Sequence, residues 1–269
     1  MSLIEAIVLG AVQGLTEFVP ISSSGHLVLV PALFGWEKPA LAFDVMLHTA
    51  SLLALLVYFS GELLELARGT LSRDTDARRL FMLLVIGTIP AVIAGVALGD
   101  YFEAAFTDAA ASAVQLVITA VILVAAELLL RVNQHRTSTR GIRLRTMDSL
   151  GGRDATVIGI AQAISILPGI SRSGSTIGAG LALSMNRDDA ARFSFLLAIP
   201  ALVGATLLEV PELGGAELGL GAAVGGFVAS LITSYAAISG LIRYLKTRTL
   251  YPFAAYCVVA GIVFYVLVS

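Results

Sequence analysis

Residues 17–26 read Glu-Phe-Val-Pro-Ile-Ser-Ser-Ser-Gly-His, and residues 168–176 read Pro-Gly-Ile-Ser-Arg-Ser-Gly-Ser-Thr. Each polar string interrupts an apolar stretch, the first within 1–34 and the second within 154–185. Proline, glycine and serine clusters break a helix, so each stretch predicts two half-length helices joined by a polar loop. Non-helical backbone at membrane depth is tolerated only inside protein or beside water. We therefore expect two re-entrant helix hairpins.

The composition of the chain places these strings in a membrane. The 269 residues are 57% hydrophobic and 13% charged, about half the charged fraction of an ordinary soluble domain. This excludes a soluble enzyme and a disordered chain, and the scattered basic residues give no sign of nucleic-acid binding. Six further segments have the ~20 mainly apolar residues that cross a bilayer, and they predict an all-α polytopic membrane protein. These six transmembrane helices are expected at Ala40–Phe59, Arg78–Leu98, Ala111–Leu130, Asp189–Leu208, Leu218–Ile242 and Leu250–Val268.

The basic residues indicate the orientation, because cytoplasmic loops carry the excess of lysine and arginine. Fifteen of the 17 basic residues fall on one side of the predicted spans, whereas the loops 99–110 and 209–217 on the other side are acidic. We expect both termini outside and the basic connection 134–153 in the cytoplasm. The basic segments are 60–79, 131–153, 187–192 and 243–249.

An internal repeat relates the two broken stretches. A shift of 149 residues aligns Gln13, Ser22, Ser24 and Gly25 with Gln162, Ser171, Ser173 and Gly174. The single membrane domain 1–269 then divides into repeats 1–133 and 154–269, each with one hairpin and three spans. Because three is odd, the second repeat must lie upside down, which predicts an inverted-topology repeat with its site where the broken segments meet.

The two loops carry groups that suit a bound phosphate. Intramembrane polar residues are expensive and indicate function by default. The N-termini of the exiting half-helices offer free N–H groups and a positive dipole end, and Arg172 offers paired donors for phosphate oxygens. If the tips meet, Ser23 is a candidate nucleophile, with Glu17 and His26 as candidate proton carriers. The polar residues of the loops are Gln13, Glu17, Ser22, Ser23, Ser24, His26, Gln162, Ser171, Arg172, Ser173, Ser175 and Thr176.

Each of these residues also has a structural interpretation. Serines before a helix commonly act as N-caps. Glu17 could pair with Arg172 without taking part in chemistry, and His26 could be a buried hydrogen-bonding residue. Asp44 and His48, in the first span, are assigned a structural role.

The two strings resemble those of the undecaprenyl-diphosphate phosphatase family, also called bacitracin-resistance proteins. The resemblance rests on residues 13–26 and 168–176, and the layout agrees over the whole chain. It implies an enzyme of the bacterial plasma (inner) membrane that hydrolyses undecaprenyl diphosphate to undecaprenyl phosphate and inorganic phosphate, recycling the lipid carrier for cell-wall synthesis. It also implies six spans and two re-entrant helix pairs in inverted repeats, with the active site open to the outer face.

The resemblance assigns roles to individual residues. It implies a divalent cation, Mg²⁺ or Ca²⁺, with Glu17 as the available metal ligand, and no organic cofactor. Well-studied members carry glutamate at both ends of the first motif, whereas this chain has Gln13, whose amide cannot act as a base. Catalytic roles are assigned to Glu17, Ser23, His26 and Arg172, and substrate binding to Gln13, Ser22, Ser24, Ser171, Ser173 and Thr176.

The mechanism that these residues suggest leaves alternatives open. Ser23 attacks the terminal phosphorus, His26 or Glu17 takes its proton, and Arg172 stabilises the transferred phosphoryl group. Direct attack by water is the alternative chemistry. A lipid-phosphate flippase or secondary transporter would use the same anion-binding loops and is the alternative function.

The expected partners are a polyprenyl diphosphate substrate and membrane lipids, without nucleic acid. A homodimer is a further expectation. Its basis is three glycines of the fifth predicted span, which serve packing either within one chain or between two chains. They are Gly221, Gly225 and Gly226.

Overall fold

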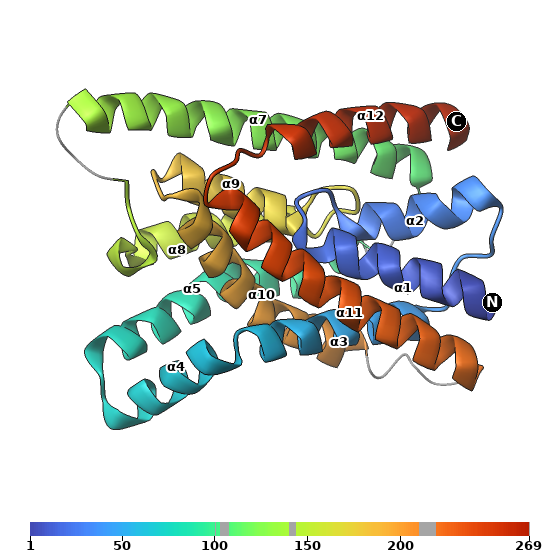
Figure 1. The fold of residues 1–269 in the computed structure, drawn as a ribbon, viewed down its shortest axis with the longest axis horizontal. Helices are drawn as coiled ribbons and strands as arrows, with labels where there is room; N and C mark the ends of the chain where they lie inside the picture. Colours follow the sequence, from blue (N-terminus) through green and yellow to red (C-terminus); the bar gives the residue numbers. More distant parts are fainter. Residues whose placement is uncertain (100, 103–107, 140–143, 210–218, 269) are drawn as a thin grey trace.

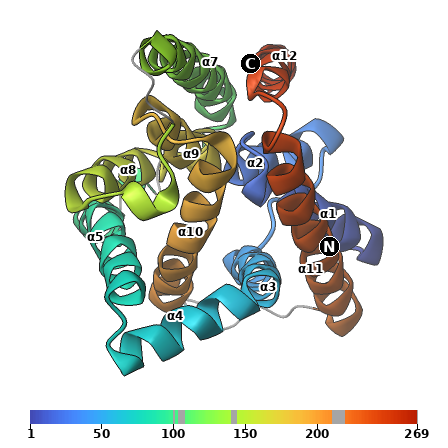
Figure 2. The same ribbon diagram turned by 60° about the vertical axis from the view of Figure 1, so that its left-hand side comes forward.

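A computed structural model describes residues 1–269 except 100, 103–107, 140–143, 210–218 and 269. The described chain is helical, with one isolated β-bridge between Arg145 and Met185. Figures 1 and 2 show the helices gathered into one bundle, with α7 and α12 side by side along one edge. The helices are α1 (Leu3–Phe18), α2 (Ser23–Phe34), α3 (Leu41–Tyr58), α4 (Ser60–Ser72), α5 (Thr75–Ala97), α7 (Ala109–Thr139), η1 (Met147–Ser149), α8 (Gly152–Ile164), α9 (Arg172–Ala182), α10 (Arg187–Glu209), α11 (Leu220–Leu245) and α12 (Tyr251–Val268).

Helices occupy all six predicted spans. Of the described helices, α3, α5, α7, α10 and α11 are long and apolar enough to cross a membrane, and α12 is a shorter apolar helix. The prediction of an all-helical, multi-pass membrane protein is confirmed. Some predicted segments lie partly outside the described residues. These parts are 100 and 103–107 of the acidic loop 99–110, 210–217 of the acidic loop 209–217, the predicted first residue Leu218, and 140–143 of the connection 134–153.

The basic segment 60–79 connects the first two predicted spans, and the structure places a helix, α4, within it. Every residue of α4 is at least partly exposed, and Glu62 pairs with Arg192 of α10. The chain then turns at Asp74, whose carboxylate caps α5 by accepting the N–H groups of Asp76 and Ala77. The charged residues therefore specify a surface helix followed by a capped span.

Each of the two polar strings separates two short helices, as predicted. The pair α1–α2 lies at the same end of the bundle as both chain termini, whereas α8 lies toward the opposite end, together with the turn between α4 and α5 (Figure 1). Within each pair the two helices are in contact. The two hairpins thus approach the middle of the bundle from opposite ends.

Two crossings between glycines hold α1 against α11 and α8 against α5. A Cβ atom on Gly10 would lie 2.2 Å from the carbonyl oxygen of Gly226, and one on Gly159 would lie 2.3 Å from that of Gly87. Backbones this close exclude every side chain. Gly10 and Gly159 are separated by 149 residues, the shift of the internal repeat. Gly225 and Gly226 pack against helices of their own chain.

A buried carboxylate joins α7, α10 and the start of α12. Glu127 of α7 accepts two hydrogen bonds from the guanidinium of Arg187 in α10, at 2.9 and 2.6 Å, and a third from the N–H of Leu250 at 2.8 Å. Its side chain is fully buried. A buried carboxylate is stable only when paired and hydrogen-bonded, so these contacts fix the start of α12 against α7 and α10.

The glycine crossing predicts a localised sensitivity to substitution. Gly10→Ala should destabilise the protein by about 1–3 kcal/mol, because its methyl group overlaps the backbone of α11. Thermal unfolding of the purified protein in detergent measures the effect. Gly240→Ala is the matched control: it lies in α11, and its Cβ would meet nothing within 4 Å among the described residues. Equal stability of the two variants would contradict the close backbone contact between α1 and α11 at Gly10.

Candidate active site

The tips of the two hairpins meet inside the bundle. The Cα of Gly169 would lie 3.0 Å from a Cβ on Gly25. Ser173 donates a hydrogen bond of 3.3 Å to the carbonyl of Val19. Gly169 has φ of +92°, a conformation that favours glycine. The two tips, which the sequence motifs predicted would meet, are therefore in contact.

Glu17 is the point at which the predicted residues converge. Its Oε1 accepts a hydrogen bond of 2.9 Å from Nη2 of Arg172, on the other hairpin. Its Oε2 accepts one of 2.5 Å from the hydroxyl of Ser23 and one of 3.1 Å from the side-chain amide of Gln13. Nε2 of His48 lies 3.8 Å from the same oxygen. One carboxylate therefore contacts the candidate nucleophile, the arginine and the amide.

The environment of this carboxylate makes its partners energetically important. The side chain of Glu17 is 5% exposed and that of Arg172 is 15% exposed. Removing one member of a buried ion pair typically costs about 3–5 kcal/mol, because the other charge stays buried without a partner. The Glu17–Arg172 pair thus stabilises the junction of the two hairpins as well as arranging the site.

Matching serine caps begin the two helices that leave the loops. Ser22 accepts the N–H of Gly25 at the start of α2, and Ser171 accepts the N–H of Gly174 at the start of α9. Each cap hydroxyl also lies within hydrogen-bond distance of the serine two residues later, 3.3 Å to Ser24 and 3.2 Å to Ser173. The capping interpretation is therefore confirmed for Ser22 and Ser171, and their predicted contact with substrate stays a prediction.

Ser22 has an unusual backbone. Its φ of 69° and ψ of 100° place a non-glycine residue at positive φ, directly before the candidate nucleophile. Such conformations cost of order 1–3 kcal/mol and persist only where surrounding contacts impose them. The equivalent residue, Ser171, has φ of −72°. The strain is therefore specific to the loop that carries Ser23.

His26 lies in the first hairpin, but both of its ring nitrogens bind groups other than Ser23. Nδ1 lies 2.7 Å from the carbonyl oxygen of Ser22, which can only accept, so Nδ1 carries the proton. Nε2 then accepts from the hydroxyl of Tyr256, 2.7 Å away in α12. The two rings are stacked, with centroids 5.7 Å apart. Ser23 has Glu17 as its hydrogen-bond partner instead.

Thr176, a predicted substrate ligand, is buried against α10. Its hydroxyl donates to the carbonyl of Arg172 at 2.8 Å and lies 2.6 Å from the hydroxyl of Ser194. These bonds join α9 to α10 one turn beyond Arg172. A contact between Thr176 and substrate stays a prediction.

Two buried polar atoms beside Glu17 have no hydrogen-bond partner within the described part of the chain. They are Nη1 of Arg172 and Oε1 of Gln13. Buried polar groups are rarely left unpaired in a native protein. A donor of this kind on an arginine that already pairs with Glu17 is suited to an oxygen of a bound anion.

Two residues of the site carried little signal in the sequence. His48 was assigned a structural role, yet its Nε2 faces Glu17 while its Nδ1 donates to the carbonyl of Asp44 at 2.8 Å. Tyr256 was not singled out at all, because it lies 230 residues from His26 in a uniformly apolar helix. An intramembrane histidine could have indicated His48, whereas no local pattern indicates Tyr256.

The residues at the site do not fit a resident metal ion. No group of three or more His, Cys, Asp and Glu side chains suited to a metal occurs in the described residues. Both oxygens of Glu17, the predicted ligand, already accept hydrogen bonds, and Arg172 places a positive charge beside them. Mg²⁺ and Ca²⁺ require several oxygen ligands, which this donor set does not supply.

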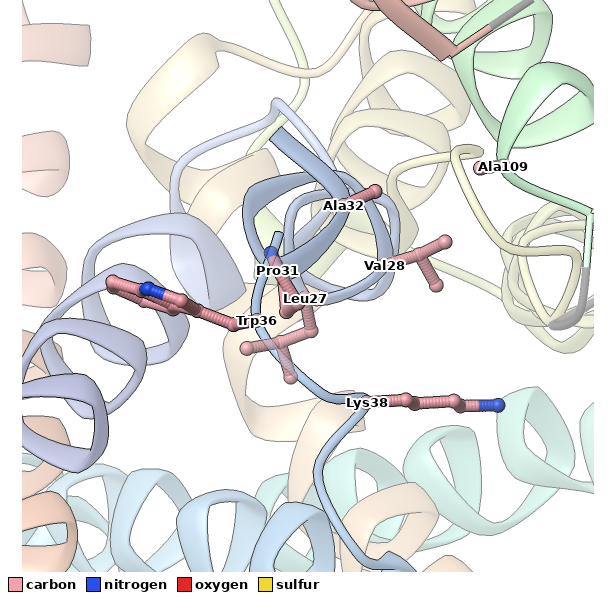
Figure 3. Close-up of a pocket in the computed structure, with 7 residues that line it drawn as sticks. All are labelled: Leu27, Val28, Pro31, Ala32, Trp36, Lys38 and Ala109. Atoms are coloured by element: carbon pink, nitrogen blue, oxygen red, sulfur yellow. The ribbon is translucent and has the colours of Figure 1, made fainter. Parts of the chain in front are cut away.

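An apolar pocket of about 270 Å³ lies along α2 beyond the site (Figure 3). Leu27 and Pro31 follow Ser23 by four and eight residues, so they lie on nearly the same side of the helix. Trp36 and Lys38 lie in the segment that follows α2 (Figure 3). Its lining residues are Leu27, Val28, Pro31, Ala32, Trp36, Lys38 and Ala109.

Comparisons with known proteins identify the family of the chain. The model of the family described as bacitracin resistance protein BacA matches residues 6–263. The chain belongs to this family. Relatives named undecaprenyl-diphosphatase include one from Gloeobacter violaceus, 45% identical over 95% of this chain and 88% of its own length. A second, from Thermomicrobium roseum, is 40% identical over 100% and 99% of the two chains, and a third, from Methanosphaera stadtmanae, is 38% identical over 98% and 97%. The family resemblance found in the two motifs is confirmed.

The burial of the Glu17–Arg172 ion pair predicts that breaking it destabilises the protein. Glu17→Gln should lower the free energy of unfolding by about 3–5 kcal/mol, because it leaves the Arg172 charge buried without its partner. Adding Arg172→Gln should restore part of this loss. Thermal unfolding in detergent provides the measurement.

Glu62→Gln is the matched control, since Glu62 and Arg192 are 37% and 39% exposed. An exposed pair contributes only ~0–1 kcal/mol, so this substitution should have a small effect. Strictly additive losses in the Glu17→Gln/Arg172→Gln double variant would show that the two side chains are not energetically coupled.

Proposed function

We propose that this chain hydrolyses undecaprenyl diphosphate to undecaprenyl phosphate and inorganic phosphate, and so returns a lipid carrier to cell-wall synthesis. The name of its relatives, undecaprenyl-diphosphatase, gives the substrate. One observation carries the chemistry: the hydroxyl of Ser23 and the guanidinium of Arg172 meet at the carboxylate of Glu17. Phosphoryl transfer needs these elements, a nucleophile, a base and a positive group beside the transferred phosphate.

In the first step, Ser23 Oγ attacks the terminal phosphorus of the diphosphate. A bond forms between Oγ and phosphorus, the anhydride bond breaks, and the lipid monophosphate leaves. The proton of Ser23 passes to Glu17 Oε2, its hydrogen-bond acceptor at 2.5 Å. Nη1 of Arg172 and the free N–H groups at the starts of α2 and α9 bind the phosphoryl oxygens, where charge must be stabilised.

In the second step, water cleaves the phosphoserine. Its oxygen bonds to phosphorus as the Ser23 Oγ–phosphorus bond breaks, and Glu17 returns its proton to Ser23 Oγ. One proton of the water stays on the new phosphate oxygen, the other leaves to solvent, and inorganic phosphate is released. Direct attack on the diphosphate by a water molecule bound at Glu17 is the alternative chemistry, in which Ser23 only binds substrate.

A divalent cation enters this proposal as part of the substrate. Mg²⁺ or Ca²⁺ would accompany the diphosphate as a counter-ion and would reduce the negative charge that reaches the site. This assignment follows from the three hydrogen bonds that the oxygens of Glu17 already accept, and from the lack of a His, Cys, Asp and Glu ligand group among the described residues. The cation would therefore be required for substrate binding without being a resident cofactor.

The proposed topology has six spans and two re-entrant pairs, α1–α2 and α8–α9, in an inverted repeat of 1–133 and 154–269. Its support is the equivalence of Ser22 with Ser171 as caps and of the crossings at Gly10 and Gly159. Both termini would face the outside of the bacterial plasma membrane, since the basic loops lie at the other end. The first hairpin would then open the site to the outer face.

The pocket along α2 is the proposed place for the first part of the polyprenyl tail. Leu27 and Pro31 continue the side of α2 on which Ser23 lies, and Pro31 is ~12 Å from Ser23 along the helix axis. Apolar walls suit isoprene units. The remaining tail would extend among membrane lipids.

Transport of a lipid phosphate is the second candidate function, because inverted repeats with broken helices also build transporters. The arginine and the helix N-termini would serve both functions. The 2.5 Å bond from Ser23 to Glu17 favours the enzyme, since transport does not need an activated hydroxyl.

Phosphate release by the purified protein tests the proposal. With undecaprenyl diphosphate and Mg²⁺ in detergent, the wild type should release phosphate. Ser23→Ala, Glu17→Gln and Arg172→Ala should each reduce kcat by at least about a hundredfold, as expected for loss of a nucleophile, base or charge stabiliser. Rapid-quench labelling should trap phosphate on Ser23.

The outcomes separate the alternatives. Full activity of Ser23→Ala would exclude nucleophilic attack by this serine and favour water. A folded wild-type protein that releases no phosphate, yet moves the lipid across vesicles, would exclude the enzyme and favour transport. Ser72→Ala, on the exposed helix α4, is the control for nonspecific effects.

A further inference from the structure

The nucleophile of the proposed reaction sits beside a strained residue that a histidine holds in place. The carbonyl oxygen of Ser22 accepts two hydrogen bonds from the same residue, from Nδ1–H of His26 at 2.7 Å and from its backbone N–H at 3.3 Å. Ser22 is the residue with φ of 69° that precedes Ser23. His26 therefore restrains the peptide that links the strained cap to the nucleophile.

A second residue contacts the other nitrogen of this histidine. Tyr256 of α12 lies with its hydroxyl 2.7 Å from Nε2 of His26 and its ring stacked on the imidazole, at an interplanar angle of 13°. The edge of Phe264, also on α12, closes another side of the ring. An imidazole that accepts at Nε2 must carry its proton at Nδ1 if it is neutral. The Ser22 carbonyl, which can only accept, therefore sets the tautomer, and the tyrosine hydroxyl completes the arrangement by donating to Nε2.

We infer that His26 and Tyr256 are positioning residues that act through Ser22 on the orientation of Ser23, and that His26 transfers no proton in the reaction. This inference rests on the proposed function, since it takes Ser23 as the nucleophile. The base role falls to Glu17, which holds the Ser23 proton, while both nitrogens of His26 are occupied by Ser22 and Tyr256. The last helix of the chain thereby contributes to a site built by the first and second hairpins.

Asparagine at position 26 separates positioning from proton transfer. Its side-chain NH₂ takes about the position of Nδ1 and can donate to the Ser22 carbonyl, yet it cannot act as a base. If the inference holds, His26→Asn should retain kcat within about threefold of wild type, because the Ser22 hydrogen bond remains. His26→Ala and His26→Gln, which lack a donor at that position, should lose about tenfold or more in kcat with little change in KM.

The tyrosine is tested in two backgrounds. Tyr256→Phe should lower kcat several-fold in the wild type, the effect expected for one hydrogen bond. In the His26→Asn background it should change kcat by less than about twofold, because no Nε2 remains for it to contact. Tyr265→Phe, at an exposed position on the same helix, is the matched control.

The tautomer can be observed without any substitution that endangers folding. The chain has three histidines, so selective ¹⁵N-histidine labelling gives few signals, and His26→Asn identifies the relevant one. The resting wild-type protein should show a neutral ring with its proton on Nδ1.

Three results would overturn the inference. They are a His26→Asn variant as inactive as His26→Ala, equal effects of Tyr256→Phe in both backgrounds, and a ring protonated at Nε2. An active Ser23→Ala variant would instead refute the proposed nucleophile, and it would leave the His26 series as a separate result.

Discussion

The structure depends on one buried ion pair, between Glu17 and Arg172. These two residues come from opposite hairpins, and their contact fixes how deeply each polar loop enters the bundle. Around the pair, backbone contacts such as Gly25 with Gly169 allow the loops to touch without intervening side chains. Because both side chains are buried, removing either one leaves the other charge without a partner inside the protein, which is strongly destabilising.

The internal repeat explains why two equivalent hairpins form only one candidate site. A shift of 149 residues relates Ser23 to Arg172, so the candidate nucleophile and the arginine proposed to bind phosphate occupy equivalent first positions of α2 and α9. The same shift relates Glu17 to Ile166 and His26 to Ser175. The two halves thus share capping and close helix packing, while acid–base groups belong to the first half alone.

Much of this arrangement was predictable because it is encoded locally. Hydropathy located the helices at all six predicted spans to within a few residues, apart from the extended end of α7. The motif spacing identified Glu17, Ser23 and Arg172, which the structure brings together. The partner of His26 was not predictable, because Tyr256 follows it by 230 residues and resembles any aromatic residue of a membrane helix. The backbone strain at Ser22 could not be predicted from the sequence either, since positive φ at a serine is imposed by tertiary contacts.

The 155-residue separation of Glu17 and Arg172 has a consequence for biogenesis. During synthesis, the first hairpin leaves the ribosome well before the arginine that neutralises it exists. A lone carboxylate is costly in hydrocarbon, so the nascent α1–α2 pair should stay near water until the second half has been inserted. The site would then form only when Arg172 pairs with Glu17, after the second half has been inserted. Fragments released by premature termination before Arg172 would be inactive.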